Sequence, residues 1–297
     1  MACHRAPIIG YHRAPLSQKF GAPRQPNLVA MISVIEMSAP YDTPAAFVGL
    51  AEFSHIWLSW QFHHNYLTKE NHLNKESHSN KESFLDKSNE PADSKTDIKF
   101  RPQVRPPRLG GNQKIGVFAS RSMYRPSGLG LSVVKLEKVA VIEGRVLLLI
   151  SGADMIDGTP IIDIKPYVTY SDALIDASSG FAPTAPAPLM VTMTQSAHEQ
   201  FTIIVNTGQS DKANYKNNHA NSGMENAALT ALVYKMQKQL LASDIDSIKA
   251  LIAQDPRPAY RREELGTKFT MRYKSVDVSF QQIEKGQMQI MTVVEVD

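Results

Sequence analysis

The sequence predicts a mainly β protein in which an N-terminal antiparallel β-barrel precedes a small α+β domain. Short runs that alternate apolar and polar residues dominate the first two thirds of the chain. Strands that follow one another without intervening helices favour a barrel or sandwich over a parallel sheet. Helical spacing of apolar residues begins only after residue 222. We therefore expect a barrel domain over residues 1–195 and an α+β domain over residues 222–297.

The clearest strand of the predicted barrel covers residues 55–64. Its residues Ile56, Leu58, Trp60 and Phe62 recur with period two, which gives the strand two distinct faces. Further strands are predicted over residues 114–120, 131–141 and 145–150. The last of these contains a short apolar run that suits a buried strand.

The predicted C-terminal domain opens with a helix. Ser222-Gly-Met-Glu225 has the spacing of a capping box. Apolar residues then recur at helical spacing as far as about Leu241, namely Leu229, Leu232, Val233, Met236 and Leu240. A second, short helix is predicted over residues 244–253. Strands are predicted over residues 268–274 and 276–282, and a turn at Lys285-Gly286 leads into a last strand over residues 288–296.

Two polar stretches interrupt this pattern. Residues 66–99 repeat Asn-Lys-Glu-Ser twice and contain few apolar side chains, and residues 206–221 are similarly polar. Such segments bury too little surface to offset the entropy of ordering them. We expect both to be flexible loops without chemistry.

Composition and charge limit the classes of function. The chain has 297 residues, of which 42% are hydrophobic, and its one cysteine, Cys3, excludes an internal disulfide and a thiolate metal cluster. No apolar run is long enough to span a membrane, and a cytoplasmic location is expected. The net charge is +3, but residues 1–25 carry four cations and residues 101–125 carry six, with no acid in either stretch. Segregated positive charge indicates a polyanionic partner.

Familiar nucleotide-binding fingerprints are missing. Gly128-Leu-Gly130 starts a Rossmann-type motif but lacks the third glycine and the strand–helix context. Four other clusters combine charge with prolines or glycines, and together they indicate a pocket at the strand ends with positive and negative walls. They are Pro23-Arg-Gln-Pro26, Arg105-Pro-Pro-Arg-Leu-Gly-Gly111, Arg121-Ser-Met-Tyr-Arg-Pro126 and the acidic stretch from Asp154 to Tyr167.

Several of these clusters lie in blocks that resemble one family. The blocks occur in the family's order and span most of the chain outside the two polar stretches. They are Lys19-Phe-Gly-Ala-Pro-Arg-Gln25, Gly49-Leu-Ala-Glu-Phe-Ser-His55, Val104-Arg-Pro-Pro-Arg-Leu-Gly-Gly-Asn112, Gly116-Val-Phe-Ala-Ser-Arg-Ser122, Asp157-Gly-Thr-Pro-Ile-Ile-Asp-Ile-Lys-Pro-Tyr167 and Asp255-Pro-Arg-Pro-Ala-Tyr260. The sequence thus resembles the TrmO/TsaA-like tRNA (N6-threonylcarbamoyladenosine)-N6-methyltransferases.

The resemblance implies a non-Rossmann β-barrel methyltransferase that works as a homodimer and binds S-adenosylmethionine near the subunit interface. It implies methylation of N6 of N6-threonylcarbamoyladenosine next to the anticodon of a threonine tRNA. The matching motifs place Pro23, Arg24, Gln25, His63, His64, Arg121, Leu131, Asp154, Met155, Ile156 and Asp157 at the cofactor. Two motifs depart from the family, which has His-Gln where this chain has His63-His64 and Arg-Pro-Asn-Pro-x-Gly where it has Arg125-Pro-Ser-Gly-Leu-Gly130.

Chemical roles follow from the residue types. Arginine matches the cofactor's carboxylate bidentately, and Asp154 or Asp157 could receive ribose hydroxyls or position the sulfonium. The target nitrogen is a poor nucleophile because its lone pair is delocalised, so a base or an aligning group should help. Asp157, Asp163 and Tyr260 are the catalytic candidates. The substrate-binding candidates are Arg105, Arg108, Arg125, Lys165, Arg257 and Tyr260, with Arg257 expected to meet a phosphate or the threonyl carboxylate.

Two other hypotheses fit parts of the sequence. A non-catalytic RNA-binding β-barrel would keep the basic loops but would not need the acidic stretch. A small-molecule methyltransferase on the same barrel would leave the basic residues around 255–274 without a role. No metal is expected in any of these hypotheses. Because His63 and His64 are adjacent on the predicted strand, their side chains should point to opposite faces, so at most one should line the pocket.

Overall fold

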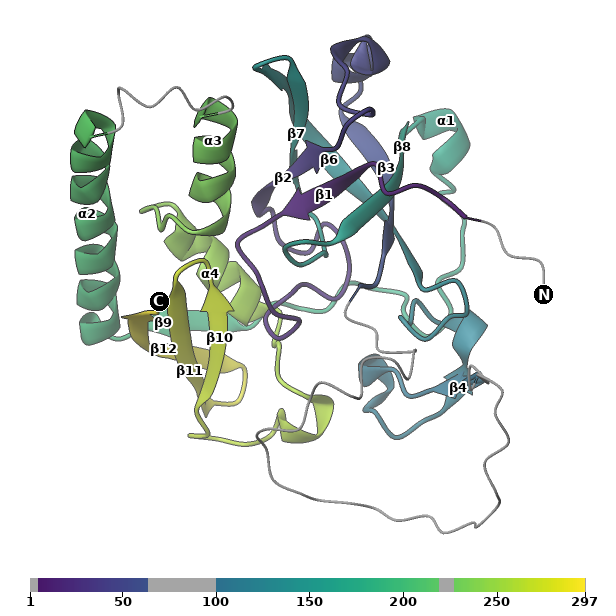
Figure 1. The fold of residues 1–297 in the computed structure, drawn as a ribbon. Coiled ribbons are helices and arrows are strands. Elements are labelled where there is room, and N and C mark those ends of the chain that lie inside the picture. The colour runs from purple at the N-terminus through teal and green to yellow at the C-terminus, as the bar shows by residue number, and fades with distance from the viewer. Residues whose placement is uncertain (1–4, 64–99, 219–226, 297) are drawn as a thin grey trace, which may run out of the picture.

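The computed structural model describes residues 5–63, 100–218 and 227–296. Six antiparallel strands close a barrel in the order β1-β2-β7-β6-β3-β8 (Figure 1). They are β1 (Gly10–Arg13), β2 (Ile32–Met37), β3 (His55–Gln61), β6 (Leu129–Ile142), β7 (Arg145–Ser151) and β8 (Pro160–Pro166). The predicted fold class is confirmed, and the strands predicted over 131–141 and 145–150 correspond to β6 and β7.

The period-two pattern of β3 fills the barrel. Ile56, Leu58 and Trp60 are buried in its core, and the residues between them are partly exposed. The register pairs Trp60 with Gly130 of β6, where a Cβ atom would lie 2.2 Å from the indole ring. Only glycine leaves room for the indole at this point of the barrel wall. The predicted strand, however, ends at Gln61 rather than at residue 64.

The prediction of a strand over residues 114–120 is wrong for all but two of these residues. Only β5 (Ile115–Gly116) forms, paired with β4 (Gln103–Val104), and the chain then turns into the short 3-10 helix η5 (Val117–Ala119). A strand needs a partner along its length, and the described partner extends over two residues. The remaining short elements are the 3-10 helices η1 (Pro44–Phe47), η2 (Leu50–Glu52), η4 (Pro107–Leu109) and η6 (Ala259–Arg261) and the helix α1 (Thr169–Asp172).

The C-terminal sheet has the strand order β10-β11-β12-β9. Its strands are β10 (Phe269–Tyr273), β11 (Val276–Glu284), β12 (Gln287–Glu295) and β9 (Met190–Met193), and the first three match the predicted ones closely. The strand β9 pairs in parallel with β12. The barrel domain predicted to end at residue 195 therefore includes a strand that belongs to the second sheet.

Three longer helices accompany the sheet: α2 (Gln195–Asn218), α3 (Ala227–Gln237) and α4 (Asp244–Ala253). The loop predicted over residues 206–221 is wrong as far as Asn218, because α2 continues through it. Ala197, Phe201 and Val205 anchor the start of α2 in the core, and once a helix is nucleated each further residue adds a hydrogen bond without the cost of a new nucleus. None of the helices described for residues 5–63, 100–218 and 227–296 has the length and apolar character needed to cross a membrane.

The helix predicted to run to Leu241 ends at Gln237 because its apolar residues serve two cores. Leu229 packs with Val34 and Leu147 on the outside of the barrel, whereas Leu240 enters the core of the C-terminal sheet. The proposed capping box at 222–225, the polar stretch 66–99 and His64 lie outside the described residues.

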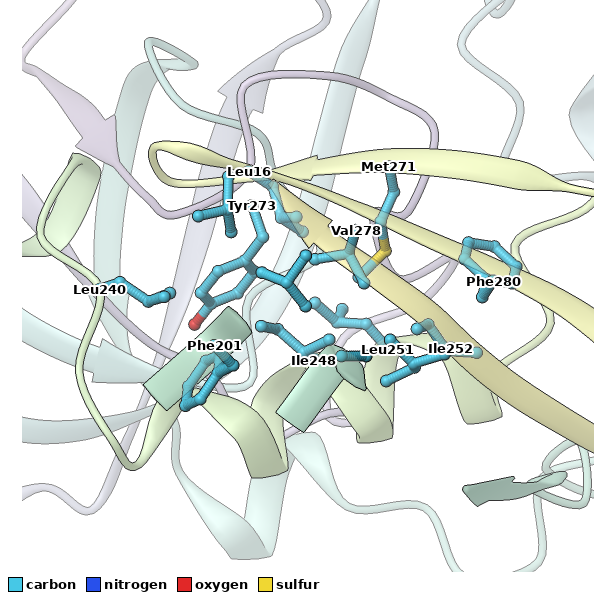
Figure 2. Close-up of a cluster of buried hydrophobic side chains, with 14 of the residues drawn as sticks. Leu16, Phe201, Leu240, Ile248, Leu251, Ile252, Met271, Tyr273, Val278 and Phe280 are labelled. Atoms are coloured by element: carbon cyan, nitrogen blue, oxygen red, sulfur yellow. The ribbon is translucent and has the colours of Figure 1, made fainter. Parts of the chain in front are cut away.

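The largest core joins the two halves of the chain. The N-terminal residues Leu16, Val29 and Met31 are buried in the same cluster as the apolar faces of α2, α4 and the C-terminal sheet. Figure 2 shows Leu16 beside Tyr273 and the side chains of α4 packed against the strands. The barrel and the α+β module therefore share one continuous hydrophobic interface.

A buried polar cluster lies at this interface. Asp244, at the start of α4, accepts a hydrogen bond from the Tyr273 hydroxyl at 2.9 Å and from Lys274 Nζ at 2.7 Å. The backbone amide of Lys274 donates to the Pro15 carbonyl at 2.7 Å. Burial lowers the pKa of Lys274, and the charge of Asp244 opposes that shift. The cluster ties the β10–β11 turn to both α4 and the N-terminal segment.

Candidate functional site

Three segments that are distant in sequence meet at the barrel: the Pro23–Gln25 loop, the segment after η5 and the segment after β7. Arg121 Nη1 donates a hydrogen bond to Gln25 Oε1 at 2.6 Å. The positive charge of Arg121 also acts on Asp154. Pro23 is buried and Arg121 is exposed, so a rigid turn holds the amide toward an accessible guanidinium. The structure thus places Arg121 in contact with Gln25 and within electrostatic range of Asp154.

Asp154 is held from inside the barrel. Ser132 Oγ donates to Asp154 Oδ1 at 2.6 Å and accepts a hydrogen bond from Trp60 Nε1 at 3.0 Å. Burial raises the pKa of the Asp154 carboxyl above its usual range, while the Ser132 hydrogen bond and the charge of Arg121 pull it back down. Sequence reasoning missed Trp60 and Ser132 as site residues. The available signal was an indole within a barrel strand, because a buried indole N–H needs an acceptor.

The carboxylate of Asp157 is occupied by hydrogen bonds that hold its loop in place. Its carboxylate accepts hydrogen bonds from the Ala14 amide at 2.9 Å and from Gln237 Nε2 at 2.8 and 2.9 Å. The preceding Met155 and Ile156 are buried at 1% and 7% exposure. These contacts tie the loop to β1 and α3, and they conflict with the prediction that Asp157 acts as a general base.

A buried histidine supports the same loop. His12 lies with Nδ1 3.2 Å from the Ile156 carbonyl and Nε2 2.8 Å from Ser33 Oγ. Because a carbonyl oxygen can only accept, Nδ1 carries the proton and Nε2 accepts from the serine. Burial lowers the pKa of His12 to about 4, so the ring is neutral at physiological pH. His12 is a third residue of the site region that sequence reasoning missed.

The C-terminal module contacts the site region at Arg24, a residue of the Pro23–Gln25 loop. Arg24 Nη2 donates to the Arg257 carbonyl oxygen at 3.0 Å. Burial lowers the pKa of Arg24, and the charge of Arg262 adds to this effect. The loop around residue 257 therefore lies against the Pro23–Gln25 loop.

The prediction that Arg257 binds phosphate conflicts with its surroundings. Its side chain is 1% exposed, and its guanidinium donates to Asp255 Oδ1 at 2.7 Å and Oδ2 at 3.1 Å. It also donates to the carbonyl oxygens of Arg262 at 2.9 Å and Glu264 at 3.3 Å. A guanidinium with these partners shapes the loop and does not reach an external anion.

Tyr260, in contrast, is fully accessible. It belongs to η6 and is 84% exposed. A Cβ atom built on Gly111 would lie 3.8 Å from Ala259 Cβ, so the loop of Arg105 and Arg108 passes beside η6. Both arginines are exposed.

Some of these arginines also make local hydrogen bonds. Arg108 Nη2 donates to the Thr184 carbonyl, and Arg125 Nη2 donates to the Leu129 carbonyl. Each of these contacts leaves the rest of the fork-shaped guanidinium for other partners.

Three predicted residues lie on the outer face of the barrel. Asp163 of β8 pairs with Ser59 of β3, which in turn pairs with Leu131 of β6. Leu131 is 55% exposed, and Asp163 and Lys165 are exposed too. Because side chains alternate along strands, these residues point away from the interior that holds Trp60 and Ser132. Within one subunit the structure does not bring them to Asp154.

His63 lies in the turn after β3, and its Nε2 would be 3.9 Å from a Cβ atom on Gly158. It therefore lies next to the acidic loop, but the argument that His63 and His64 point to opposite faces does not apply outside a strand. Within residues 5–63, 100–218 and 227–296, no group of three or more histidine, cysteine or acidic side chains is placed to hold a metal ion.

Comparison with known proteins identifies the family. Residues 11–173 match the tRNA-methyltransferase O N-terminal domain, and residues 226–296 match the TrmO C-terminal domain. The tRNA (adenine(37)-N6)-methyltransferase of Escherichia coli K12 is 34% identical over 282 residues, which cover 92% of this chain and 94% of that protein. A relative from Pseudomonas aeruginosa, 33% identical over 276 residues, has a name that places it among S-adenosylmethionine-dependent methyltransferases.

A solved structure agrees with the sequence comparisons. The crystal structure of TrmO from Pseudomonas aeruginosa superposes with a TM-score of 0.64 and 27% identity, covering 99% of both chains. Both family domains, the relatives and the barrel architecture lead to the same assignment. The chain belongs to the TrmO family of S-adenosylmethionine-dependent tRNA methyltransferases.

Proposed function

We propose that this enzyme methylates N6 of N6-threonylcarbamoyladenosine next to the anticodon of a threonine tRNA. Relatives from Escherichia coli and Eikenella corrodens bear the name tRNA (adenine(37)-N6)-methyltransferase, which supports an adenine N6 target. The observation that carries the proposal is the convergence of Gln25, Arg121 and Asp154 from three separate segments beside the loop of Tyr260.

The side chains at this point fit S-adenosylmethionine. The cofactor combines a carboxylate, a sulfonium cation and ribose hydroxyls, and it supplies an electrophilic methyl group when bound. Arg121 is an exposed cation suited to a carboxylate, and Gln25 accepts its hydrogen bond. The desolvated Asp154 is suited to a hydroxyl or to the sulfonium. We assign cofactor binding to these three residues, with Pro23 and Arg24 shaping the loop.

The substrate side of the proposed site belongs to η6 and the neighbouring loop. The target nitrogen is conjugated with a purine and a carbonyl, so its N–H must be aligned for transfer. Tyr260 is the remaining candidate that is both exposed and carried by a loop in contact with Arg24. We assign the aligning role to Tyr260 and phosphate or threonyl binding to Arg105, Arg108 and Arg125.

We further propose that a homodimer in the cytoplasm completes the site. Leu131, Asp163 and Lys165 lie on the outer face of the barrel, away from Asp154 of the same subunit. They can serve the reaction if a second subunit packs across that face. In that arrangement Asp163 would act on a substrate held by the neighbouring subunit.

The test is methyl transfer to defined transfer RNAs. Purified protein and S-adenosylmethionine are incubated with threonine tRNA that carries N6-threonylcarbamoyladenosine and with the same tRNA that lacks it. Nucleosides are then analysed by mass spectrometry. We expect one added methyl group on the threonylcarbamoyl nucleoside only.

The controls separate the other hypotheses. Methylation of unmodified adenosine alone would contradict the proposed substrate but leave the family activity intact. Binding of tRNA without any methyl transfer would support a non-catalytic RNA-binding barrel, and transfer to small molecules alone would support the other alternative. Arg121→Ala should abolish cofactor-dependent turnover at low cofactor concentration while leaving the fold unchanged.

A further inference from the structure

Two aromatic rings lie exposed beside the proposed site. Phe118 is 74% exposed and Phe100 is 51% exposed, and their ring centroids are 6.2 Å apart at an interplanar angle of 31°. The short β4–β5 pairing and the hydrogen bond from the Val117 amide to the Pro102 carbonyl at 2.9 Å hold the two rings together. Large apolar side chains presented to solvent in a fixed pair indicate a binding surface.

The aromatic pair lies in a stretch of cations that contains no acidic residue. Residues 101–125 contain six cations and no acid, namely Arg101, Arg105, Arg108, Lys114, Arg121 and Arg125. In the part of the chain that the structure describes, none of the six forms a salt bridge.

Cations elsewhere in the structure behave differently. Arg13, Arg145, Arg261 and Arg272 each lie within salt-bridge distance of a carboxylate. Residues 100–125 are therefore a positively charged stretch, which favours a polyanionic partner.

The aromatic pair also lies in the segment that leads to the proposed cofactor site. Phe118 precedes Arg121 by three residues, and Arg121 bonds Gln25 of the proposed cofactor site. The same segment passes beside η6 at Gly111, next to the exposed Tyr260. An aromatic surface so placed can hold a base close to the one that receives the methyl group.

We propose that Phe118, backed by Phe100, is a stacking platform for an unpaired base of the tRNA, with the surrounding cations on its phosphates. The proposal rests on the proposed function and specifies how that site holds its substrate. Unpaired bases stack on aromatic side chains in single-stranded RNA recognition, while arginine and lysine contact the backbone. A second copy of the chain is a poorer occupant, because a two-fold contact through this surface would bring the same cations together.

The experiment measures tRNA binding and cofactor binding separately on the full-length protein. The probe is an anticodon stem–loop of threonine tRNA, titrated at several salt concentrations. Phe118→Ala should weaken binding about 5- to 150-fold, because one base loses its stacking partner. The slope of binding against salt should stay unchanged, since no charge is removed. Phe118→Trp should retain affinity, and S-adenosylmethionine binding should be unchanged in both.

Matched variants complete the design. Tyr170, in α1, is an aromatic residue that is 93% exposed, and Figure 1 shows α1 and β4 at opposite ends of the barrel half of the molecule. Tyr170→Ala should therefore not change RNA binding. Wild-type affinity in Phe118→Ala would overturn the platform, as would a change of oligomeric mass in light scattering with RNA binding unchanged. Loss of RNA affinity without any methyl transfer by the wild-type enzyme would support the platform and contradict the proposed reaction.

Discussion

At the scale of single residues, the organising contact is the chain of hydrogen bonds from Trp60 through Ser132 to Asp154. It begins inside the barrel and ends at the proposed cofactor site. Ser132 is buried, so its hydroxyl has no water to satisfy it and keeps a fixed direction. The barrel core thus sets both the position and the ionisation of Asp154.

Replacement of Ser132 by alanine should shift the pH dependence of cofactor binding. The serine bond favours the ionised carboxylate, so its loss raises the pKa of Asp154 further above its usual range. A cationic cofactor binds the ionised form, and its affinity falls as pH decreases through that pKa. We expect the acidic limb of the binding curve to move to higher pH, measured by calorimetry between pH 4 and 8.

The matched control is Ser279→Ala, since Ser279 is also buried and bonded to a hydroxyl, that of Thr270 at 2.9 Å. This variant should change the stability of the protein without moving the acidic limb of the cofactor-binding curve. Trp60→Phe should move the limb in the same direction as Ser132→Ala but less, because the hydroxyl remains. An unmoved limb in Ser132→Ala would show that Asp154 does not titrate with cofactor binding.

At the scale of elements, the periodic spacing of apolar residues determined which strands and helices the sequence could predict. Alternation identified β3, and helical spacing identified α3, because both face a core on one side. The polarity of residues 206–218 predicted a loop, and that prediction is wrong. The helix α2, anchored by Phe201, continues through this polar stretch. A helix whose first turns are anchored in a core can extend into a polar segment, because the cost of nucleation has already been met.

The candidate site shows a similar limit on what can be predicted from the sequence. Charged motifs selected Gln25, Arg121 and Asp154, which interact in the structure because loops at strand ends converge in a barrel, and their role at the cofactor stays a prediction. They gave the wrong role to Arg257, whose prolines and charge suggested an exposed ligand. Its partner Asp255 is only two residues away, yet the carbonyls that complete its shell depend on the folded loop. Burial of a charge is a tertiary property that local spacing does not reveal.

The cluster of Asp244, Tyr273 and Lys274 yields a prediction for stability. Asp244→Ala should lower the free energy of unfolding by about 3–5 kcal/mol, because it leaves the buried Lys274 ammonium without its counter-charge. The double variant Asp244→Leu with Lys274→Met should regain much of this loss, since it removes both charges. Urea unfolding of the three proteins measures the difference. Equal stability of the single and double variants would contradict this account.

At the scale of the whole molecule, the shared core makes the two halves interdependent. A fragment of residues 1–188 should aggregate, because Leu16, Val29 and Met31 lose the partners that bury them. Changing these three residues to serine in the same fragment should restore its solubility, whereas in the full chain the same changes should destabilise the fold. Sedimentation and dye binding distinguish these outcomes. A soluble, compact wild-type fragment would show that the barrel folds alone.

The joint core also sets an order of events during synthesis. The segment of Leu16, Val29 and Met31 is synthesised before the strands that cover it, β10 to β12. About 240 residues separate the two, which corresponds to about 10–50 s of translation. These apolar residues therefore wait for their native partners until the C-terminal sheet has been synthesised.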